Sequence, residues 1–238
     1  MTTTGTSTFN LDLNNLVEEA FERAGGELRT GYDLRTARRS LNLLTIEWAN
    51  RGINLWTIES GSIAMVQGTI AYNLPVDTID LLEQVIRTNA GTSSNQLDIN
   101  INRISADTYI TIPNKNAQGR PIQVWINRQS GATEPTSGVA YPQINVWPAP
   151  DQSNYYTFFY YRLRRLQDAG NGVNTQDIPF RFLPCMVAGL AYYLSLKVPG
   201  AMERTPMLKA MYDEAWQQAA DEDREKAPLR IAPRMSFT

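Results

Sequence analysis

The sequence predicts an α+β protein with helices at both ends of the chain and strands between them. Near the N-terminus and in the last quarter, apolar residues recur at three- and four-residue steps, as in amphipathic helices. The middle alternates short apolar runs with turns that contain Gly or Pro, which is typical of strands. The residues after Pro228 are too few in apolar side chains to fold alone. We therefore predict a bundle of four main helices, two N-terminal and two C-terminal, with an inserted, mostly antiparallel β module and an extended C-terminal arm.

The same pattern predicts where these parts begin and end. The helical body should comprise residues 9–52 together with 178–226, and the β-rich module should comprise residues 53–177. The arm should comprise residues 227–238. With 238 residues, of which 42% are hydrophobic, the chain is long enough for one substantial core, or for a core with a satellite module.

Composition argues against several classes of function. The net charge is -2 and charged residues make up 19% of the chain, which does not fit a strongly basic nucleic-acid binder. The chain has no histidine, so the usual general base and the commonest metal ligand are missing. The single cysteine, Cys185, cannot form an intrachain disulfide, and its apolar surroundings in the sequence predict a buried, inert thiol.

Neither a signal peptide nor a membrane span is predicted. The first residues have no basic region followed by an apolar one. The longest apolar run, residues 185–196, is shorter than the ~20 residues that cross a bilayer. We expect a soluble protein from a reducing compartment, with no membrane partner.

Two amphipathic helices are predicted near the N-terminus. The first should run over residues 12–24, with Asp12 or Asn10 as its N-cap and the glycines after Ala24 as its end. The second should run over residues 34–51 with Asp33 as its N-cap. Its apolar stripe contains these residues: Leu34, Ala37, Leu41, Leu44 and Trp48.

A second apolar edge on the second helix is the first candidate contact surface. Leu43 and Ile46 lie off the main stripe, which fits a helix that touches two neighbours. The simpler interpretation is that both edges are core. The alternative is contact with a second subunit, for which Leu43, Ile46 and Trp56 are the candidate residues.

The middle of the chain should form a series of short strands. Residues 62–66 and 69–74, on either side of Gln67 and Gly68, are typical of a hairpin. One helical turn, capped by Ser105, is expected at residues 105–110, and a loop at 131–138. The other predicted strands are residues 53–58, 82–88, 97–102, 122–128, 143–147 and 155–163.

The last of these strands is rich in aromatic residues. Aromatic side chains alternate onto both faces of residues 155–163, which predicts a central strand that is covered on both sides. The alternative is a platform on which nucleic-acid bases stack, assisted by Arg162, Arg164 and Arg165.

Two further helices are predicted near the C-terminus. Residues 180–197 are apolar nearly all round, as in a buried helix. Residues 205–226 should form the other helix, whose predicted inner face consists of Met207, Leu208, Met211, Ala215 and Trp216. Its acidic end is best interpreted as solvated, with a magnesium site as the alternative; it contains Asp221, Glu222, Asp223 and Glu225.

The sequence contains no recognisable catalytic or cofactor motif. It lacks a Gly-rich phosphate loop, a dinucleotide fingerprint and a nucleophile elbow. Carboxylates are numerous, so a glycosidase-like pair that hydrolyses cell wall stays open as an alternative. We predict no cofactor, no metal and no enzymatic activity.

The C-terminal arm is the second candidate contact surface. Apolar residues alternate with polar or small ones in part of it, so an extended segment could add to a sheet edge or lie in a groove of another chain. A frayed terminus is the alternative. The candidate docking residues are Leu229, Arg230, Ile231, Pro233, Arg234, Met235 and Phe237.

The order of several short segments resembles a known family. Residues 47–52 end a helix, and residues 55–61 follow; further on come residues 112–115, 118–121 and the helical stretch 178–197. In this order, and over residues 9–226, the chain resembles the head-to-tail adaptor of short-tailed bacteriophages, also called tail tubular protein A or tail accessory factor.

The resemblance implies a structural role in the virion. Such an adaptor forms a ring of twelve copies below the portal protein, continues the DNA channel, and receives the tail nozzle and tail fibre proteins. DNA would pass through the lumen without specific binding, and the arm would reach the portal. Assembly would take place in the host cytoplasm. Some adaptors of this kind have been discussed as cell-wall hydrolases, but no residue here is recognisable as carrying that activity.

Overall fold

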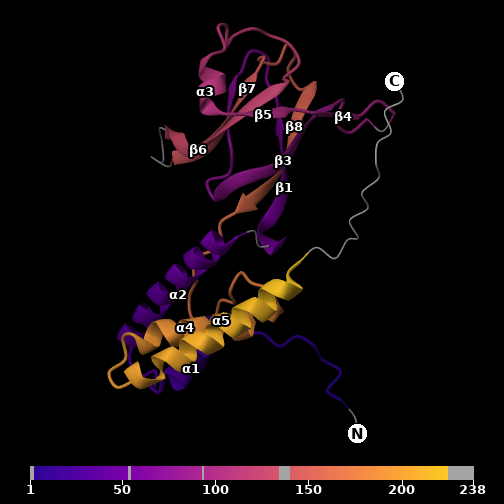
Figure 1. The fold of residues 1–238 in the computed structure, drawn as a ribbon. Coiled ribbons are helices and arrows are strands. Elements are labelled where there is room, and N and C mark those ends of the chain that lie inside the picture. Colours follow the sequence, from indigo (N-terminus) through magenta and orange to yellow (C-terminus); the bar gives the residue numbers. More distant parts are fainter. Residues whose placement is uncertain (1–2, 53–54, 93, 134–139, 225–238) are drawn as a thin grey trace, which may run out of the picture. The chain divides into compact units, whose positions relative to one another are not determined.

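The computed structural model describes residues 3–52, 55–92, 94–133 and 140–224 (Figure 1). It confirms an α+β protein, with helices and two mostly antiparallel sheets. The described residues fall into two compact units: those up to Trp56 together with those from Leu166 onward, and Thr57–Arg165. We call these the helical unit and the β unit. The predicted arm, residues 227–238, lies outside the described residues.

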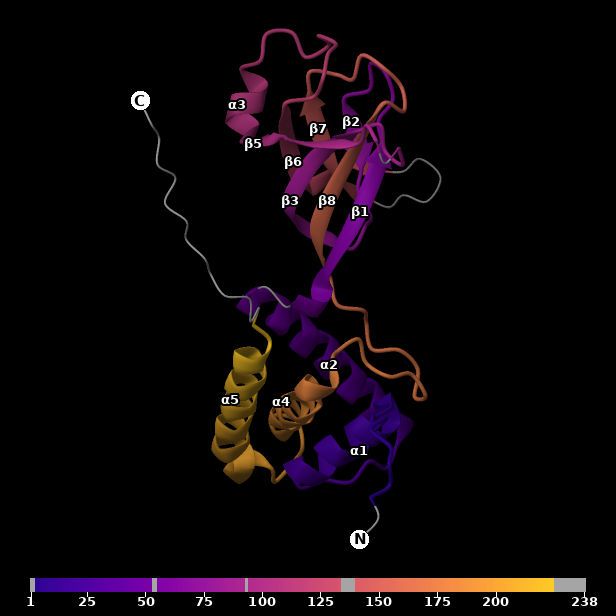
Figure 2. The ribbon, with the colours of Figure 1, turned by 90° about the vertical axis from the view of Figure 1, so that its right-hand side faces the viewer.

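The helical unit is organised around one buried helix. It contains α1 (Leu13–Ala24), α2 (Gly31–Arg51), α4 (Leu183–Ser195) and α5 (Thr205–Glu222). Helix α4 packs against α1, α2 and α5, and Figure 2 shows it between α1 and α5. Almost all of its side chains are buried, so the prediction of a helix covered on every side is confirmed.

Close packing against α4 depends on a glycine. A Cβ atom at Gly189 would lie 2.9 Å from the ring of Tyr212 and 3.0 Å from the side chain of Leu44. Glycine at this position therefore lets α2 and α5 both approach α4. Short 3-10 turns also occur in the described part of the chain; they are η1 (Leu55–Thr57), η2 (Phe180–Phe182) and η3 (Met202–Arg204).

The N-terminal caps follow the sequence in one helix and differ in the other. The Asp12 side chain accepts a hydrogen bond from the Asn15 amide and caps α1, as predicted. Asp33 is not the N-cap of α2, and that prediction was wrong. Thr30 is the cap, and Asp33 completes a capping box by accepting a hydrogen bond from the Thr30 amide at 3.0 Å. Helix α2 therefore begins at Gly31.

The two C-terminal helices differ from their predicted limits. Residues 180–182 form η2, and α4 ends at Ser195 rather than at residue 197. In α5 the buried residues are Leu208, Tyr212 and Ala219, whereas Met207 and Met211 are exposed. The predicted inner face was right for Leu208, Ala215 and Trp216, which pack on the core, and wrong for the two methionines. Tyr212, which was not predicted, lies on the buried face, and its hydroxyl group accepts a hydrogen bond from Trp48.

The β unit consists of two four-stranded sheets. The first has the order β1 (Ile58–Ala64), β8 (Tyr156–Arg164), β3 (Thr78–Thr88), β4 (Leu97–Asn100). The second has the order β2 (Ala71–Asn73), β7 (Ala140–Trp147), β6 (Gln123–Thr133), β5 (Asn102–Ile104). Only β5 and β6 pair in parallel among the described strands. Helix α3 (Ala106–Ile110) is capped by Ser105, as predicted.

The core of the β unit is shared by both sheets. Phe158 and Ile86 from the first sheet, and Val124 and Ile144 from the second, belong to one buried cluster. Strand β8 lies between β1 and β3, so the prediction of a central strand is confirmed. Coverage of both its faces was predicted, but Tyr161 on the second face is 47% exposed.

Several strand predictions were wrong, and two of them failed because the chain crosses between the sheets. The predicted hairpin at residues 62–74 does not form, since β1 pairs with β8 and β2 pairs with β7. The predicted strand 97–102 divides in the same way into β4 and β5, with the buried Ile101 between them. Residues 55–57 form η1 rather than a strand, and residues 131–133 belong to β6 rather than to a loop.

Candidate protein-contact surface

The outer face of α2 combines arginines with exposed apolar side chains. We define the α2 outer face as the residues Tyr32, Arg35, Arg38, Arg39, Leu43 and Ile46. The opposite side of the helix, with Leu41, Leu44 and Trp48, is fully buried in the core of the unit. Most residues of the α2 outer face are instead exposed, and among the described residues its arginines form no ion pair within the helical unit.

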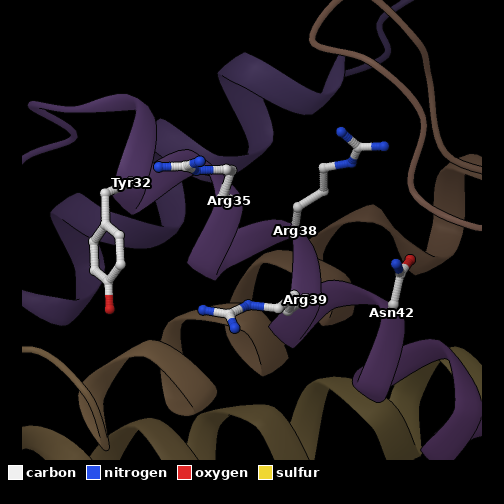
Figure 3. A pocket seen from close by; sticks show the side chains of 5 residues that line it. All are labelled: Tyr32, Arg35, Arg38, Arg39 and Asn42. Atoms are coloured by element: carbon white, nitrogen blue, oxygen red, sulfur yellow. The ribbon is translucent and has the colours of Figure 1, made fainter.

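The arginine half of this face borders a hollow of about 570 Å3 (Figure 3). The hollow is lined by Tyr32, Arg35, Arg38, Arg39 and Asn42. The Arg38 Nε atom donates to the Ala169 carbonyl at 3.2 Å, and the Asn42 side chain accepts from the Ala169 amide at 2.8 Å. These two bonds fix one edge of the hollow against the segment that leads into η2.

The three arginines form an uncompensated group of positive charges. Among the described residues, no carboxylate lies within ion-pair distance of Arg35, Arg38 or Arg39, and Arg39 bonds only to the Thr36 hydroxyl group. Like charges three or four residues apart destabilise a helix by ~0.2–0.5 kcal/mol per pair. A negatively charged partner would remove that cost, so this face is suited to binding an anionic surface.

A neighbouring lysine adds to the positive charge around Arg39. The Lys197 ammonium group donates to the buried Ser40 hydroxyl group at 2.7 Å. Burial, and then the positive charge of Arg39, lower the pKa of Lys197. The shift of this pKa agrees with a local surplus of positive charge.

Leu43 and Ile46 are exposed on this face. Their exposed fractions are 54% and 42%, so the interpretation of both residues as core was wrong. The burial pattern of α2 explains the difference, because the side turned toward α4 is filled by other residues of the helix. Their role at a subunit interface stays a prediction.

Trp56, the third predicted interface residue, has a different environment. It is partly buried and packs on the core, with its ring centroid 4.5 Å from that of Phe182. Its indole Nε1 atom donates to the Asp177 carbonyl at 3.2 Å. Much of its surface is thus used within the helical unit. The predicted arm residues Leu229–Phe237 lie outside the described residues.

Several side chains of the strand that was considered as a base-stacking platform are buried within the β unit. Tyr156, Phe158 and Tyr160 are buried in the core of the β unit. Arg162 is also buried, and its guanidinium group lies 2.6 Å from an Asp77 oxygen and 2.8 Å from a Glu59 oxygen. These side chains are therefore not available to stack on bases or to bind phosphate.

Three described carboxylates have pKa values that do not suit a general acid. Burial opposes ionisation of Glu47, but hydrogen bonds from Tyr193 and Arg51 outweigh it and lower its pKa. Burial also opposes ionisation of Asp77, but hydrogen bonds from Arg162 outweigh it and lower that pKa. A hydrogen bond from Arg87, with burial acting against it, lowers the pKa of Asp98. A general acid requires the opposite shift.

The predictions for metal, thiol and membrane can be compared with the described part of the chain. It contains no group of three acidic or cysteine side chains that could hold a metal ion; Glu225 of the acidic end is not described. Cys185 is buried, and burial raises the pKa of its thiol to about 12, which fits the predicted inert thiol. No helix among the described residues is long and apolar enough to cross a bilayer.

Sequence reasoning found the apolar half of the α2 outer face and missed its arginine half. Arg35, Arg38 and Arg39 fall within five residues on a helix without a carboxylate at the four-residue spacing that would pair with them. That absence was the signal that could have identified them.

Comparison with known proteins agrees with a role in protein contact. A search of curated proteins returned no match. The family model described as SU10 adaptor protein matches residues 12–232, which span the β unit and most of the helical unit. The phage-adaptor part of the resemblance is thereby confirmed, whereas the assignment to tail tubular protein A is not. The chain belongs to the SU10 adaptor protein family, and it is a structural adaptor of a phage virion that contacts other virion proteins.

Proposed function

We propose that this protein is a head-to-tail adaptor whose copies form a ring, twelve in number, between the portal protein and the tail nozzle and fibres. The ring continues the DNA channel, and DNA passes through it without specific binding. The four-helix bundle builds the wall of the ring, and the β module faces tail components or neighbouring subunits. Membership of the adaptor family supports this role.

The single observation that carries the ring is the α2 outer face, on which exposed apolar side chains lie beside arginines that have no carboxylate partner among the described residues. A ring needs one surface of each copy to bind a different surface of the next copy. Apolar side chains beside uncompensated charges, such as Leu43 and Ile46 beside the arginines, are suited to such a contact.

Removing the exposed apolar residues should weaken the ring. We expect Leu43→Gln/Ile46→Gln to reduce the number of adaptor copies bound per portal, as counted by mass photometry, because the apolar centre of the contact is lost. The free energy of unfolding should change by less than about 0.5 kcal/mol, since both side chains are exposed. The matched control is Met207→Gln/Met211→Gln, an exposed pair on α5. Full occupancy in the first variant would contradict a contact through this face.

The C-terminal arm supplies the attachment to the portal in this proposal. An arm that becomes ordered only on a finished portal would make assembly sequential. Its apolar residues would occupy a groove or sheet edge, and Arg230 and Arg234 would add polar contacts to that site.

Deleting residues 229–238 should abolish attachment to the portal and leave the fold unchanged. Negative-stain images and co-sedimentation with purified portal measure attachment, and circular dichroism measures folding. The control keeps the arm's length but replaces its apolar residues, through Leu229→Ser, Ile231→Ser, Met235→Ser and Phe237→Ser, and it should fail to attach in the same way. Normal attachment of the truncated protein would refute the role of the arm.

The two alternatives are a virion cell-wall hydrolase and a nucleic-acid-binding module. The lowered pKa values of Glu47, Asp77 and Asp98 and the internal pairing of Arg162 support neither. Peptidoglycan release and salt-dependent affinity for short duplex DNA are their respective tests.

A further inference from the structure

The helical unit has a second surface whose chemistry complements the α2 outer face. A hollow of about 620 Å3 lies along α1 and beside the N-terminal end of α4. Leu183 and Val187 contribute apolar lining, and Phe9, which is 77% exposed, lies at its edge. We call this surface the α1 groove; its other lining residues are Asn10, Leu11, Asn15, Glu18, Glu19, Glu22, Arg23 and Pro184.

The charges of the α1 groove are only partly compensated. Glu19 pairs with Arg23, whose Nε atom lies 2.8 Å from its carboxylate. Glu18 and Glu22 are exposed and have no cation within ion-pair distance in the described part of the chain. The groove therefore presents two free carboxylates next to an apolar floor.

The two surfaces match in spacing as well as in sign. Glu18 and Glu22 are four residues apart on α1, and Arg35 and Arg39 are four residues apart on α2. Both pairs are therefore separated by about 6 Å along their helices. If two such helices pack antiparallel, with Arg35 opposite Glu22 and Arg39 opposite Glu18, Ile46 lies beyond the first turn of α1, at the end of the groove that Leu11 and Phe9 line.

A single chain cannot satisfy both surfaces by itself. Helices α1 and α2 both pack on α4, and the charged and apolar side chains of the α2 outer face are exposed beside this core. The α1 groove instead adjoins α4 itself. No ion pair joins the two surfaces among the described residues. The partner that fits each surface is therefore another copy of the chain.

We infer that the α2 outer face of one subunit docks into the α1 groove of the next, with Arg35 and Arg39 facing Glu22 and Glu18. The contact is heterologous, because each copy offers one surface to each neighbour, and repetition of the contact closes a ring. Leu43 and Ile46 cover the apolar part of the groove. This inference rests on the proposed ring and specifies its subunit contact.

Charge reversal tests the pairing. Arg35→Glu/Arg39→Glu and, separately, Glu18→Arg/Glu22→Arg should each reduce the number of portals with a complete ring by roughly tenfold or more, because like charges then face each other. The chain that carries all four substitutions should recover ring formation, since opposite charges meet again. Arg204→Glu/Lys209→Glu, which changes the net charge of the same unit equally at exposed positions, should have no effect.

Cross-linking tests the same contact independently. The chain with Arg39→Cys and Glu18→Cys, treated with a short bismaleimide on the assembled portal, should give a ladder of covalent oligomers. Each single variant should give no ladder, because a heterologous contact brings the two different positions together. The only native thiol, Cys185, is buried and serves as the background control.

The outcomes separate this inference from the proposed function. If the wild-type protein forms no ring on the portal, the proposed function fails. If wild-type rings form but charge reversal has no effect and no ladder appears, the pairing is refuted and the ring stands. If Arg35→Glu/Arg39→Glu forms normal rings but loses affinity for short duplex DNA, the α2 outer face is a nucleic-acid contact, which also refutes the pairing.

Discussion

Replacing Trp48 by alanine should lower the free energy of unfolding of the helical unit by about 3–5 kcal/mol. The side chain is fully buried, and its ring lies 5.5 Å from that of Phe182 and 5.2 Å from that of Trp216, measured between centroids. Its Nε1 atom donates to the Tyr212 hydroxyl group at 2.9 Å. Alanine would leave a large cavity between α2, η2 and α5 and remove the hydrogen bond that joins α2 to α5.

Two further variants separate packing from hydrogen bonding at this position. Trp48→Phe fills most of the volume but cannot donate to Tyr212, so we expect a loss of about 1–2 kcal/mol. Leu43→Ala on the exposed side of the same helix should change stability by less than about 0.5 kcal/mol. Urea unfolding followed by far-ultraviolet circular dichroism measures all three. A similar cost for Trp48→Ala and Leu43→Ala would contradict the description of the core.

The helices were largely predictable because their signals are local. The cap at Asp12, the apolar periodicity of α2 and the all-round apolar character of α4 depend only on residues a few positions apart. The errors arose where residues distant in the sequence determine which side chains are buried. In α5 the long-range hydrogen bond from Trp48 to Tyr212 helps to fix the inward face, and Met207 and Met211, although apolar, point outward.

The pairing of the strands was much less predictable. The turn at Gln67 and Gly68 was found, but a turn sequence does not specify which strands it joins. Here Met65 and Tyr72 both pack in the shared core. The Tyr72 hydroxyl group accepts a hydrogen bond from the Val66 amide and donates one to the Val66 carbonyl. The chain crosses between the sheets at this point. Only the tertiary contacts distinguish such a crossing from a hairpin.

Only the apolar half of the candidate surface could be predicted from the sequence, for a similar reason. Leu43 and Ile46 stood out because they interrupt a helical pattern, whereas the arginines beside them resembled an ordinary solvated helix face. Their significance depends on the fact that no neighbouring element in the described part of the chain supplies a carboxylate partner, which a sequence does not display. The fold therefore adds the information on which side chains of different helices and strands lie close enough to form ion pairs.

The second large effect on stability is expected from the loss of the ion-pair network at Arg162. Its guanidinium group is buried and contacts Asp77, Glu59 and the Thr78 hydroxyl group at 2.6, 2.8 and 3.0 Å. Arg162→Met removes these charge-assisted bonds across β1, β8 and the start of β3, and leaves two carboxylates without this partner. Because both carboxylates are partly exposed and Glu59 keeps a contact with Arg164, we expect a loss of about 2–4 kcal/mol rather than more.

The same variant should change how stability depends on pH. Burial would raise the pKa of Asp77, but hydrogen bonds from Arg162 outweigh it and lower that pKa. A carboxyl group whose pKa is lowered by folding stabilises the protein above its ordinary pKa, about 3.9, and loses that contribution as the pH falls through the lowered value. The difference in unfolding free energy between wild type and Arg162→Met should therefore shrink as the pH falls below about 4.

Arg128→Met is the matched control, because Arg128 is exposed and its ion pair with Asp80 lies in the same unit. An exposed pair contributes about 0–1 kcal/mol, so this variant should remain close to wild type. Chemical unfolding at several pH values measures both variants. Equal losses for Arg128→Met and Arg162→Met, or a gap that widens as the pH falls, would show that the buried network does not hold the first sheet of the β unit together.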